Sequence, residues 1–265
     1  MEDNNECCNE LKDSPGVLAS RRRILVIVPA YNEAGAVGNV VNKIQRCLPD
    51  VDVLVVNDGS SDSTSAIAER AGAMVLDLPY NMGIGAAMQA GYKFAHRRGY
   101  DIAVQCDGDG QHHPSQINKL IEALMDGDAD IVLGSRYLSS RKFKSTIPRR
   151  LGIFVFSNVL SLIVGQKLTD TTSGFRAVNK EVIESFSVYY PSDYPEPEAL
   201  VILHKEGFTI NEMPVSMSSR RNGSSSITAW KSTYYAFKVL LAIFVDLFKK
   251  IPYKKSSRMG DPNQC

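Results

Sequence analysis

The chain has 265 residues, of which 44% are hydrophobic and 22% are charged. These proportions are those of a globular protein, and they exclude a collagen, a coiled coil or a wholly disordered chain. The formal net charge is only +1, so no overall electrostatic attraction draws the chain to nucleic acid. The length fits one large α/β domain or two small domains.

The N-terminal segment 1–20 is polar, acidic and without hydrophobic periodicity, and we interpret it as a disordered tail. It lacks the apolar stretch of a secretory signal. Nowhere does the sequence contain the roughly 20 consecutive apolar residues that a membrane-spanning helix needs. We therefore expect a cytoplasmic protein.

From Arg21 onwards, short apolar runs rich in β-branched residues alternate with helical patterns. The runs are Ile24–Val28, Val53–Val56, Ala73–Leu78, Ile102–Gln105 and Ile131–Leu133, and the helical patterns cover 34–47, 62–71, 84–97 and 115–125. Continuous apolar strands separated by helices predict a parallel sheet that is covered on both faces. Right-handed crossovers make this a doubly wound, Rossmann-like α/β fold, which binds ligands at the carboxyl ends of its strands.

The regular alternation ends after residue 150. The apolar segment Leu151–Gly165 is either a core helix or a membrane-facing helix. A loop over Thr169–Arg176, helices near 179–186 and 195–206, and a strand near 208–213 are predicted to follow.

Residues 228–250 have the pattern of a helix that is apolar on nearly every side, and a lysine cluster follows in the basic tail 251–265. Such a helix can lie in a membrane interface, with its basic neighbours on anionic headgroups. The alternative is a helix that packs in the core or against another subunit.

Polar residues follow the first two predicted strands, in Pro29–Glu33 and in Val56–Asp62. Tyr31 offers a ring on which a base could stack, and the carboxylates of Glu33 and Asp58 offer acceptors for a base or a ribose hydroxyl. Two acidic strand ends on neighbouring strands favour a nucleotide site over a simple turn and helix cap.

The fourth strand ends in Asp107-Gly108-Asp109, with Gln111 two residues further on. Two carboxylates and an amide at this spacing are hard oxygen ligands, which suit Mg²⁺ or Mn²⁺. The alternative interpretation is a turn that precedes the next helix.

Six segments, taken in order, resemble the family 2 glycosyltransferases of the GT-A fold, and among them the dolichyl- and polyprenyl-phosphate sugar synthases. The segments are Pro29–Glu33, Asn57–Asp62, Asn81–Gly85, Asp107–Gln111, Gly134–Tyr137 and Ser173–Arg176. The resemblance covers residues 23–227, and it implies a glycosyltransferase domain over 21–227.

The resemblance also implies roles for individual residues. The nucleotide sugar would be held by Pro29, Tyr31, Glu33, Val56, Asp58, Asp107, Gly108, Arg221 and Ser225. The metal ion would be bound by Asp107, Asp109 and Gln111, and the catalytic residues would be Asp107, Asp109, Arg136 and Arg150. One departure from the family is Ser226, where synthases of this branch often have Lys.

The expected function is an inverting, metal-dependent transfer of a hexose from a UDP- or GDP-linked sugar to a polyprenyl phosphate. The place of reaction would be the cytoplasmic face of a membrane, which the protein contacts peripherally, with homo-oligomers as a further possibility and no nucleic-acid partner. Because a phosphomonoester is already anionic near pH 7, this acceptor needs no general base.

Two other functions stay open. In the first, the acceptor is a hydroxyl of a glycan or a lipid-linked saccharide in cell-surface polysaccharide synthesis. A carboxylate must then take the proton, and Asp193, Glu196 and Glu198 are the candidates; otherwise these acids lie in an exposed loop that caps the next helix. In the second, the chain binds a nucleotide sugar without catalysis, which the intact Asp107-Gly108-Asp109 disfavours.

Overall fold

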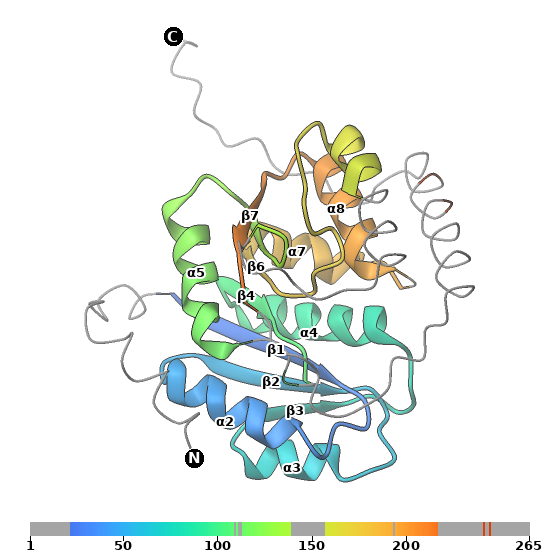
Figure 1. Ribbon diagram of the computed structural model, residues 1–265. Helices are drawn as coiled ribbons and strands as arrows, with labels where there is room; N and C mark the ends of the chain where they lie inside the picture. Colours follow the sequence, from blue (N-terminus) through green and yellow to red (C-terminus); the bar gives the residue numbers. More distant parts are fainter. Residues whose placement is uncertain are drawn as a thin grey trace.

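The computed structural model describes residues 22–108, 110, 113–138, 157–192, 194–216, 241 and 244. In this part of the chain, one 7-stranded sheet has the order β3-β2-β1-β4-β6-β5-β7 (Figure 1). Its strands are β1 (Ile24–Ala30), β2 (Asp52–Asn57), β3 (Met74–Asp77), β4 (Ile102–Gln105), β5 (Ile131–Ser135), β6 (Arg176–Asn179) and β7 (Ile210–Pro214). Strand β6 runs antiparallel to β4 and β5, and the other neighbouring strands are parallel.

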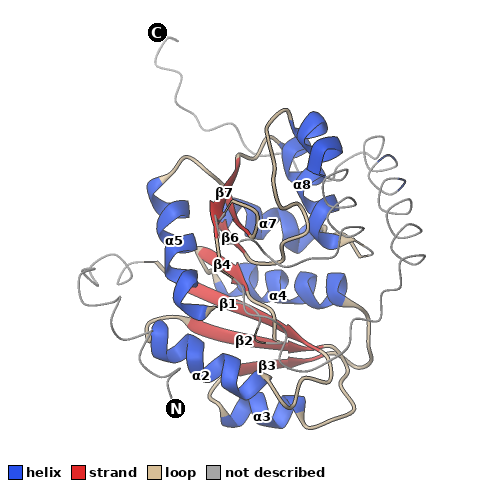
Figure 2. Ribbon diagram, in the orientation of Figure 1, coloured by secondary structure: helices blue, strands red, loops and turns tan. Residues whose placement is uncertain are grey.

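Helices cover both faces of the sheet (Figure 2). One face packs against α2 (Val37–Cys47), α3 (Thr64–Arg70) and α5 (Ile117–Asp126), which follows the short 3-10 turn η2 (Pro114–Gln116). The other face packs against α4 (Ile84–Arg98), α7 (Lys180–Val188), α8 (Pro195–Glu206) and a helix over 157–164. Along β1, Leu25 and Ile27 enter one core while Val26 and Val28 enter the other. Burial on both faces explains why this strand is apolar throughout.

The predicted doubly wound α/β architecture is confirmed, and the predicted strands and helices of the first half are present. The predicted loop ends at Phe175 and the helix predicted near 179–186 is present as α7, but a strand that was not predicted, β6 (Arg176–Asn179), lies between them. This strand has only 4 residues, and a polar residue stands at each end of it. So short a segment has no periodicity that sequence analysis can detect; its pairing with β4 and β5 makes it a strand.

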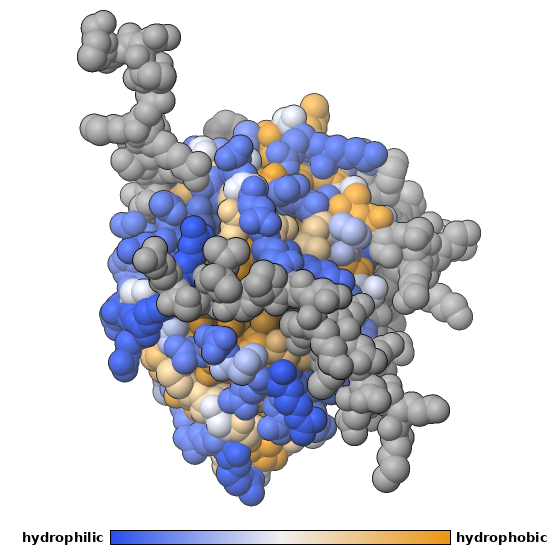
Figure 3. Space-filling view, turned by 90° about the vertical axis from the view of Figure 1, so that its left-hand side faces the viewer, coloured by the Kyte–Doolittle hydropathy of each residue, from blue (hydrophilic) through white to orange (hydrophobic). Residues whose placement is uncertain are grey.

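The apolar segment Leu151–Gly165 contributes a core helix. Leu160 and Val164 are buried against the sheet, whereas Leu162 is 85% exposed. Residues 151–156 lie outside the described part, as do the predicted tails 1–20 and 251–265 and most of the predicted helix 228–250. Among the described residues, no helix combines the length and the hydrophobicity that crossing a bilayer requires. On the face shown in Figure 3, hydrophilic residues cover much of the described surface and divide the apolar areas.

Candidate active site

The sequence-predicted site residues that the structure describes lie at one edge of the sheet, where β1, β2, β4 and β5 end. Strand β1 has β2 on one side and β4 on the other: the chain leaves β1 toward β2 and leaves β4 toward β5 on the opposite side, so the connections diverge between β1 and β4. Such a switch point opens a crevice at the carboxyl ends of parallel strands. Tyr31, Asp58, Asp107 and Arg136 all follow strands at this edge.

The loops after β1 and β2 are joined by hydrogen bonds between backbone and side chains. Asn32, which has a positive φ of 54°, accepts a hydrogen bond from the Ser61 amide through Oδ1 at 2.9 Å. The Glu33 amide donates to Thr64 Oγ1 at 2.9 Å, and the Ala34 amide donates to Asp62 Oδ2 at 3.2 Å. These bonds hold the two loops in one arrangement and leave the Tyr31 ring half exposed.

Asp58 is buried and is committed to the loop before α4. Its Oδ1 accepts a hydrogen bond from the Met82 amide at 2.7 Å, and its Oδ2 accepts one from the Gly83 amide at 3.0 Å. Gly83 is the N-cap of α4, with a φ of 89° that favours glycine. The segment Asn81–Gly85 is therefore a helix-opening turn, and Asp58 determines where this turn lies.

Pro29 and Val56 lie within the sheet, each as the second-last residue of its strand, β1 and β2. Their backbones are paired in the β1–β2 register, and the Val56 side chain is fully buried in the core. Its side chain therefore belongs to the core and not to the rim of the crevice.

Asp107 follows β4, and the turn that carries it packs closely against the end of β1. A Cβ on the buried Gly108 would lie 3.0 Å from the Pro29 carbonyl oxygen, so only glycine allows this approach without a shift. On the other side, a Cβ on Gly174 would lie 3.3 Å from Asp107 Oδ1, so the 173–175 turn contacts the Asp107 carboxylate closely. Asp109 and Gln111 lie outside the described residues.

Arg136 follows β5 and is almost buried, with a side-chain exposure of 10%. Its guanidinium pairs with the fully buried Asp170, and it also donates from Nη2 to Thr172 Oγ1 at 2.8 Å. Burial lowers the pKa of Arg136, because it disfavours the charged guanidinium. The hydrogen bonds and the charge of Asp170 outweigh this effect and raise the pKa overall, and the charge of Asp107 adds to the rise. The other predicted phosphate-binding residues, Arg150, Arg221 and Ser225, lie outside the described part of the chain.

The structure adds a residue to which sequence analysis gave no role, the fully buried Arg176 on β6. Its Nη2 donates to the Ser173 carbonyl oxygen at 2.8 Å, but Nε and Nη1 have no hydrogen-bond partner among the described residues. The buried hydroxyls of Tyr92 and Tyr190 also lack partners there. Burial raises the pKa of both tyrosines, and the positive charge of Arg176 partly opposes this. The sequence identified Ser173–Arg176 as a motif, but the burial of Arg176 follows from its place in β6, which the sequence did not predict.

Glu196 and Glu198, two of the candidate general bases, lie in the first turn of a helix and not in an exposed loop. Helix α8 begins at Pro195; Glu196 is half-buried, Glu198 is buried, and Asp193 lies outside the described residues. Burial raises the pKa of Glu196, and the charge of Arg176 opposes the rise. The charges of Asp107 and Arg136 also act on Glu196, so this carboxylate lies near both.

The loop that leads to Glu196 is fixed against α4. A Cβ on Gly85 would come within 2.2 Å of the Pro191 carbonyl oxygen, so the start of α4 and the Pro191–Ser192 backbone are in direct contact. The turn held by Asp58 and the segment before Glu196 therefore keep a defined relative position.

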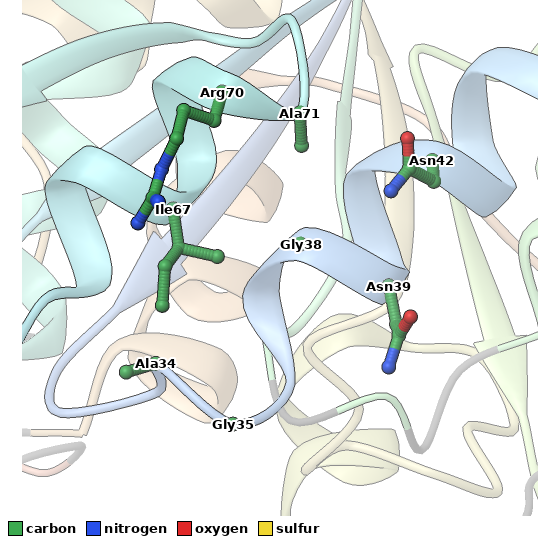
Figure 4. Close-up of a pocket in the computed structure, with 8 residues that line it drawn as sticks. All are labelled: Ala34, Gly35, Gly38, Asn39, Asn42, Ile67, Arg70 and Ala71. Atoms are coloured by element: carbon green, nitrogen blue, oxygen red, sulfur yellow. The ribbon is translucent and has the colours of Figure 1, made fainter.

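A separate hollow of about 440 Å³ lies between α2 and α3 (Figure 4). Its lining consists of Ala34, Gly35, Gly38, Asn39, Asn42, Ile67, Arg70 and Ala71. None of these is a predicted site residue, although Ala34 belongs to the loop after β1 that also carries Tyr31 and Glu33.

The profile of the family described as Glycosyl transferase family 2 matches residues 25–186. The chain belongs to this family. It is therefore a glycosyltransferase, as predicted.

Two relatives of this glycosyltransferase indicate the branch of the family. Polyprenol monophosphomannose synthase of Mycolicibacterium smegmatis is 31% identical over 237 residues, which cover 86% of this chain and 89% of that protein. A UDP-N-acetylglucosamine–dolichyl-phosphate N-acetylglucosaminyltransferase of Methanococcus voltae is 32% identical over 212 residues, covering 72% of this chain and 84% of that protein.

A solved structure confirms the predicted GT-A fold. Glucosyl-3-phosphoglycerate synthase from Mycobacterium tuberculosis, crystallised with Mn²⁺, UDP and glucosyl-3-phosphoglycerate, superposes on this glycosyltransferase with a TM-score of 0.65. The match covers 92% of this chain and 87% of that chain at 19% sequence identity.

Proposed function

We propose that this glycosyltransferase moves a hexosyl unit from a UDP- or GDP-linked sugar to a polyprenyl phosphate, with inversion at the anomeric carbon. The proposal rests mainly on the positions of Asp107, an expected cation ligand, and Arg136, an expected phosphate ligand. They follow β4 and β5 at the same edge of the sheet, with only β6 between these strands, and the charge of Asp107 acts on Arg136. Relatives named for polyprenyl- and dolichyl-phosphate transfer support this acceptor class. Because those two relatives carry different sugars in their names, they do not select the sugar.

The chemistry of the acceptor agrees with such a site. An oxygen of the lipid phosphate would attack C1 of the sugar while the bond from C1 to the diphosphate breaks, and the electron pair would leave with the nucleoside diphosphate. A phosphomonoester has a second pKa of about 6 and is already a nucleophilic anion near pH 7. Negative charge develops on the leaving diphosphate, where Arg136, and by resemblance Arg150, Arg221 and Ser225, would stabilise it.

A divalent cation, Mg²⁺ or Mn²⁺, is part of the proposal. Within the described ranges, no three His, Cys, Asp or Glu side chains group together, but Asp107 offers a carboxylate at the strand end. Asp109 and Gln111 would complete a set of hard oxygen ligands that suits either ion. When bound, the cation would compensate the charge of the diphosphate.

The nucleoside would lie across the loops after β1 and β2. Tyr31 and Glu33 would contact it directly. Asp58 would act by holding the 82–83 backbone, and Pro29, Val56 and Gly108 would shape the floor on which it lies.

A hydroxyl acceptor in cell-surface polysaccharide synthesis is the second candidate, and Glu196 favours it. Burial raises the pKa of this carboxylate, which lies near Asp107 and Arg136 and keeps some solvent contact. A raised pKa and such a position are what a general base requires.

Domain limits and location form a separate part of the proposal. The catalytic domain would span 21–227, and the apolar helix 228–250 with its basic tail would contact the cytoplasmic face of a membrane or a second copy of the chain.

The test is to incubate the purified full chain with UDP- and GDP-linked hexoses, Mg²⁺ or Mn²⁺, and undecaprenyl or dolichyl phosphate in detergent, and to follow sugar transfer to the lipid. We expect transfer to a lipid phosphate, and Glu196→Gln should retain most of this activity. The exposed Glu69→Gln on α3 is the control. A loss of about 100-fold or more in Glu196→Gln alone would identify a general base and would favour the hydroxyl acceptor.

A further inference from the structure

The turn over 173–175 enters the sheet between the two strands that lead to the expected cation and phosphate ligands. Strand β6 begins at Arg176, directly after the turn, and lies between β4 and β5. Because β6 runs antiparallel to both neighbours, Arg176 pairs with Gln105, the last residue of β4, and with β5 two residues before its end. The turn therefore lies at the edge of the sheet where Asp107 follows β4 and Arg136 follows β5.

Hydrogen bonds attach this turn to both β5 and β6. The Ser173 hydroxyl donates to the Gly134 carbonyl oxygen at 2.7 Å, and the Gly134 amide donates to the Phe175 carbonyl oxygen at 2.8 Å. From β6, Nη2 of Arg176 donates to the Ser173 carbonyl oxygen at 2.8 Å. The side chains of Ser173, Phe175 and Arg176 are all buried, so water competes little for these bonds. The backbone of the turn is therefore fixed relative to the sheet.

Gly174, in the middle of the turn, lies against two side chains at the end of β4. A Cβ on Gly174 would lie 2.9 Å from Gln105 Nε2 and 3.3 Å from Asp107 Oδ1. Gly174 does not have a positive φ, so its backbone conformation is open to other residues, and the close contacts are what favour glycine. Gln105 is only 1% exposed, and a packed interior gives its amide little space to move aside. A methyl group at position 174 would therefore press on the Asp107 carboxylate.

We propose that Gly174 is a positioning residue for the cation site. Its bare backbone allows the Asp107 carboxylate to lie against the fixed turn, and the turn in return limits where this carboxylate can lie. The inference rests on the proposed function, in which Asp107 binds the divalent cation. Gly174 contacts neither cation nor substrate in this role and acts only through Asp107. Groups that orient a metal ligand in this way typically alter metal affinity by about 10- to 100-fold when they are changed.

The test measures Mn²⁺ binding to the purified full chain by electron paramagnetic resonance of the free ion, with UDP and, in parallel, GDP present. Gly174→Ala should bind Mn²⁺ about tenfold more weakly than wild type, because the methyl group displaces Asp107 Oδ1. Gln105→Ala alone should stay within about twofold of wild type. In the double variant, the space left by the Gln105 amide receives the methyl group, so the affinity should return to within about twofold of wild type.

Gly38→Ala on α2 is the matched control. Gly38 is half-buried, as Gly174 is, and a Cβ on it would also meet a side-chain atom at 2.9 Å, Cγ2 of Ile67 on α3. This variant introduces a comparable steric conflict away from Asp107. Its melting temperature should change by as much as that of Gly174→Ala, and its Mn²⁺ affinity should stay at the wild-type value. A purely structural role of Gly174 predicts the same result for both variants.

Ser173→Ala tests the same turn without adding an atom, and it replaces Gly174→Ala if that variant does not fold. It removes the hydrogen bond to the Gly134 carbonyl oxygen and so loosens the turn beside Asp107. We expect Mn²⁺ binding to weaken by about threefold, the size that follows from losing part of one hydrogen bond. Wild-type affinity in this variant would contradict the positioning role.

Three further outcomes separate the inference from the proposed function. Wild-type Mn²⁺ affinity in a folded Gly174→Ala would overturn the positioning role alone. A double variant as weak as Gly174→Ala would overturn it too, because the loss would then not come from crowding at the end of β4. A wild-type chain that binds no Mn²⁺ with either nucleotide would overturn the proposed cation site, and the inference with it.

Discussion

Replacing Glu206 by Gln should remove a loss of stability that the wild-type protein undergoes as the pH rises from about 5 to about 8.5. Glu206 is the last residue of α8 and is buried, with the Ser185 hydroxyl of α7 donating to its Oε2. Its Oε1 has no hydrogen-bond partner among the described residues. Burial raises the pKa of Glu206 from 4.5 to about 7, and the Ser185 hydrogen bond lowers it only in part.

The sign follows from proton linkage. A carboxyl with a raised pKa in the folded state binds a proton more tightly there than in the unfolded chain, so folding is favoured at low pH. This stabilisation is complete below pH 4.5 and is lost as the pH rises through about 7. One pKa unit corresponds to about 1.4 kcal/mol, so the change between pH 5 and pH 8.5 amounts to about 2.5 kcal/mol in the free energy of unfolding.

The assay is urea unfolding of the wild type and Glu206→Gln at the two pH values, followed by circular dichroism. The amide stays neutral throughout, so the variant should lack about 2.5 kcal/mol of the pH-dependent decrease. The exposed Glu181→Gln on α7 is the control and should keep the wild-type decrease. Equal pH dependence in wild type and Glu206→Gln would refute the assignment of a raised pKa to this carboxyl.

Three further predictions concern the crevice at the strand ends. Asp58→Ala should raise the donor KM more than it lowers kcat, because the 82–83 backbone loses both hydrogen bonds that position it; an unchanged KM in initial-rate kinetics would contradict this. Gly108→Ala should lower the stability by about 1–3 kcal/mol and reduce kcat, since the new methyl group would meet the Pro29 carbonyl oxygen, and a wild-type melting temperature would argue against the packing. Asp109→Ala should nearly abolish transfer and leave the circular dichroism spectrum unchanged, and full turnover in EDTA would refute the need for a cation.

The general architecture could be predicted because its signals are local. Strands such as β1 are buried on both faces and are therefore apolar throughout, and the helices between them carry their own periodicity. The Asp107-Gly108-Asp109 turn could likewise be placed at a ligand-binding edge, since parallel strands end together. The roles assigned to the residues of this edge stay predictions.

The amino-acid sequence was sufficient to predict the alternation of strands and helices, the GT-A family and the acidic ends of β1, β2 and β4, because each of these signals lies within a few neighbouring residues. Only the three-dimensional structure shows that Arg176 is buried, that Glu196 is half-buried in the first turn of α8 and that Asp170 pairs with Arg136 across 34 positions of the chain. All three depend on how the chain returns after residue 157, with β6 inserted antiparallel between β4 and β5. A strand of 4 residues has no periodicity of its own, and only its hydrogen bonds to both neighbours give it a place in the sheet.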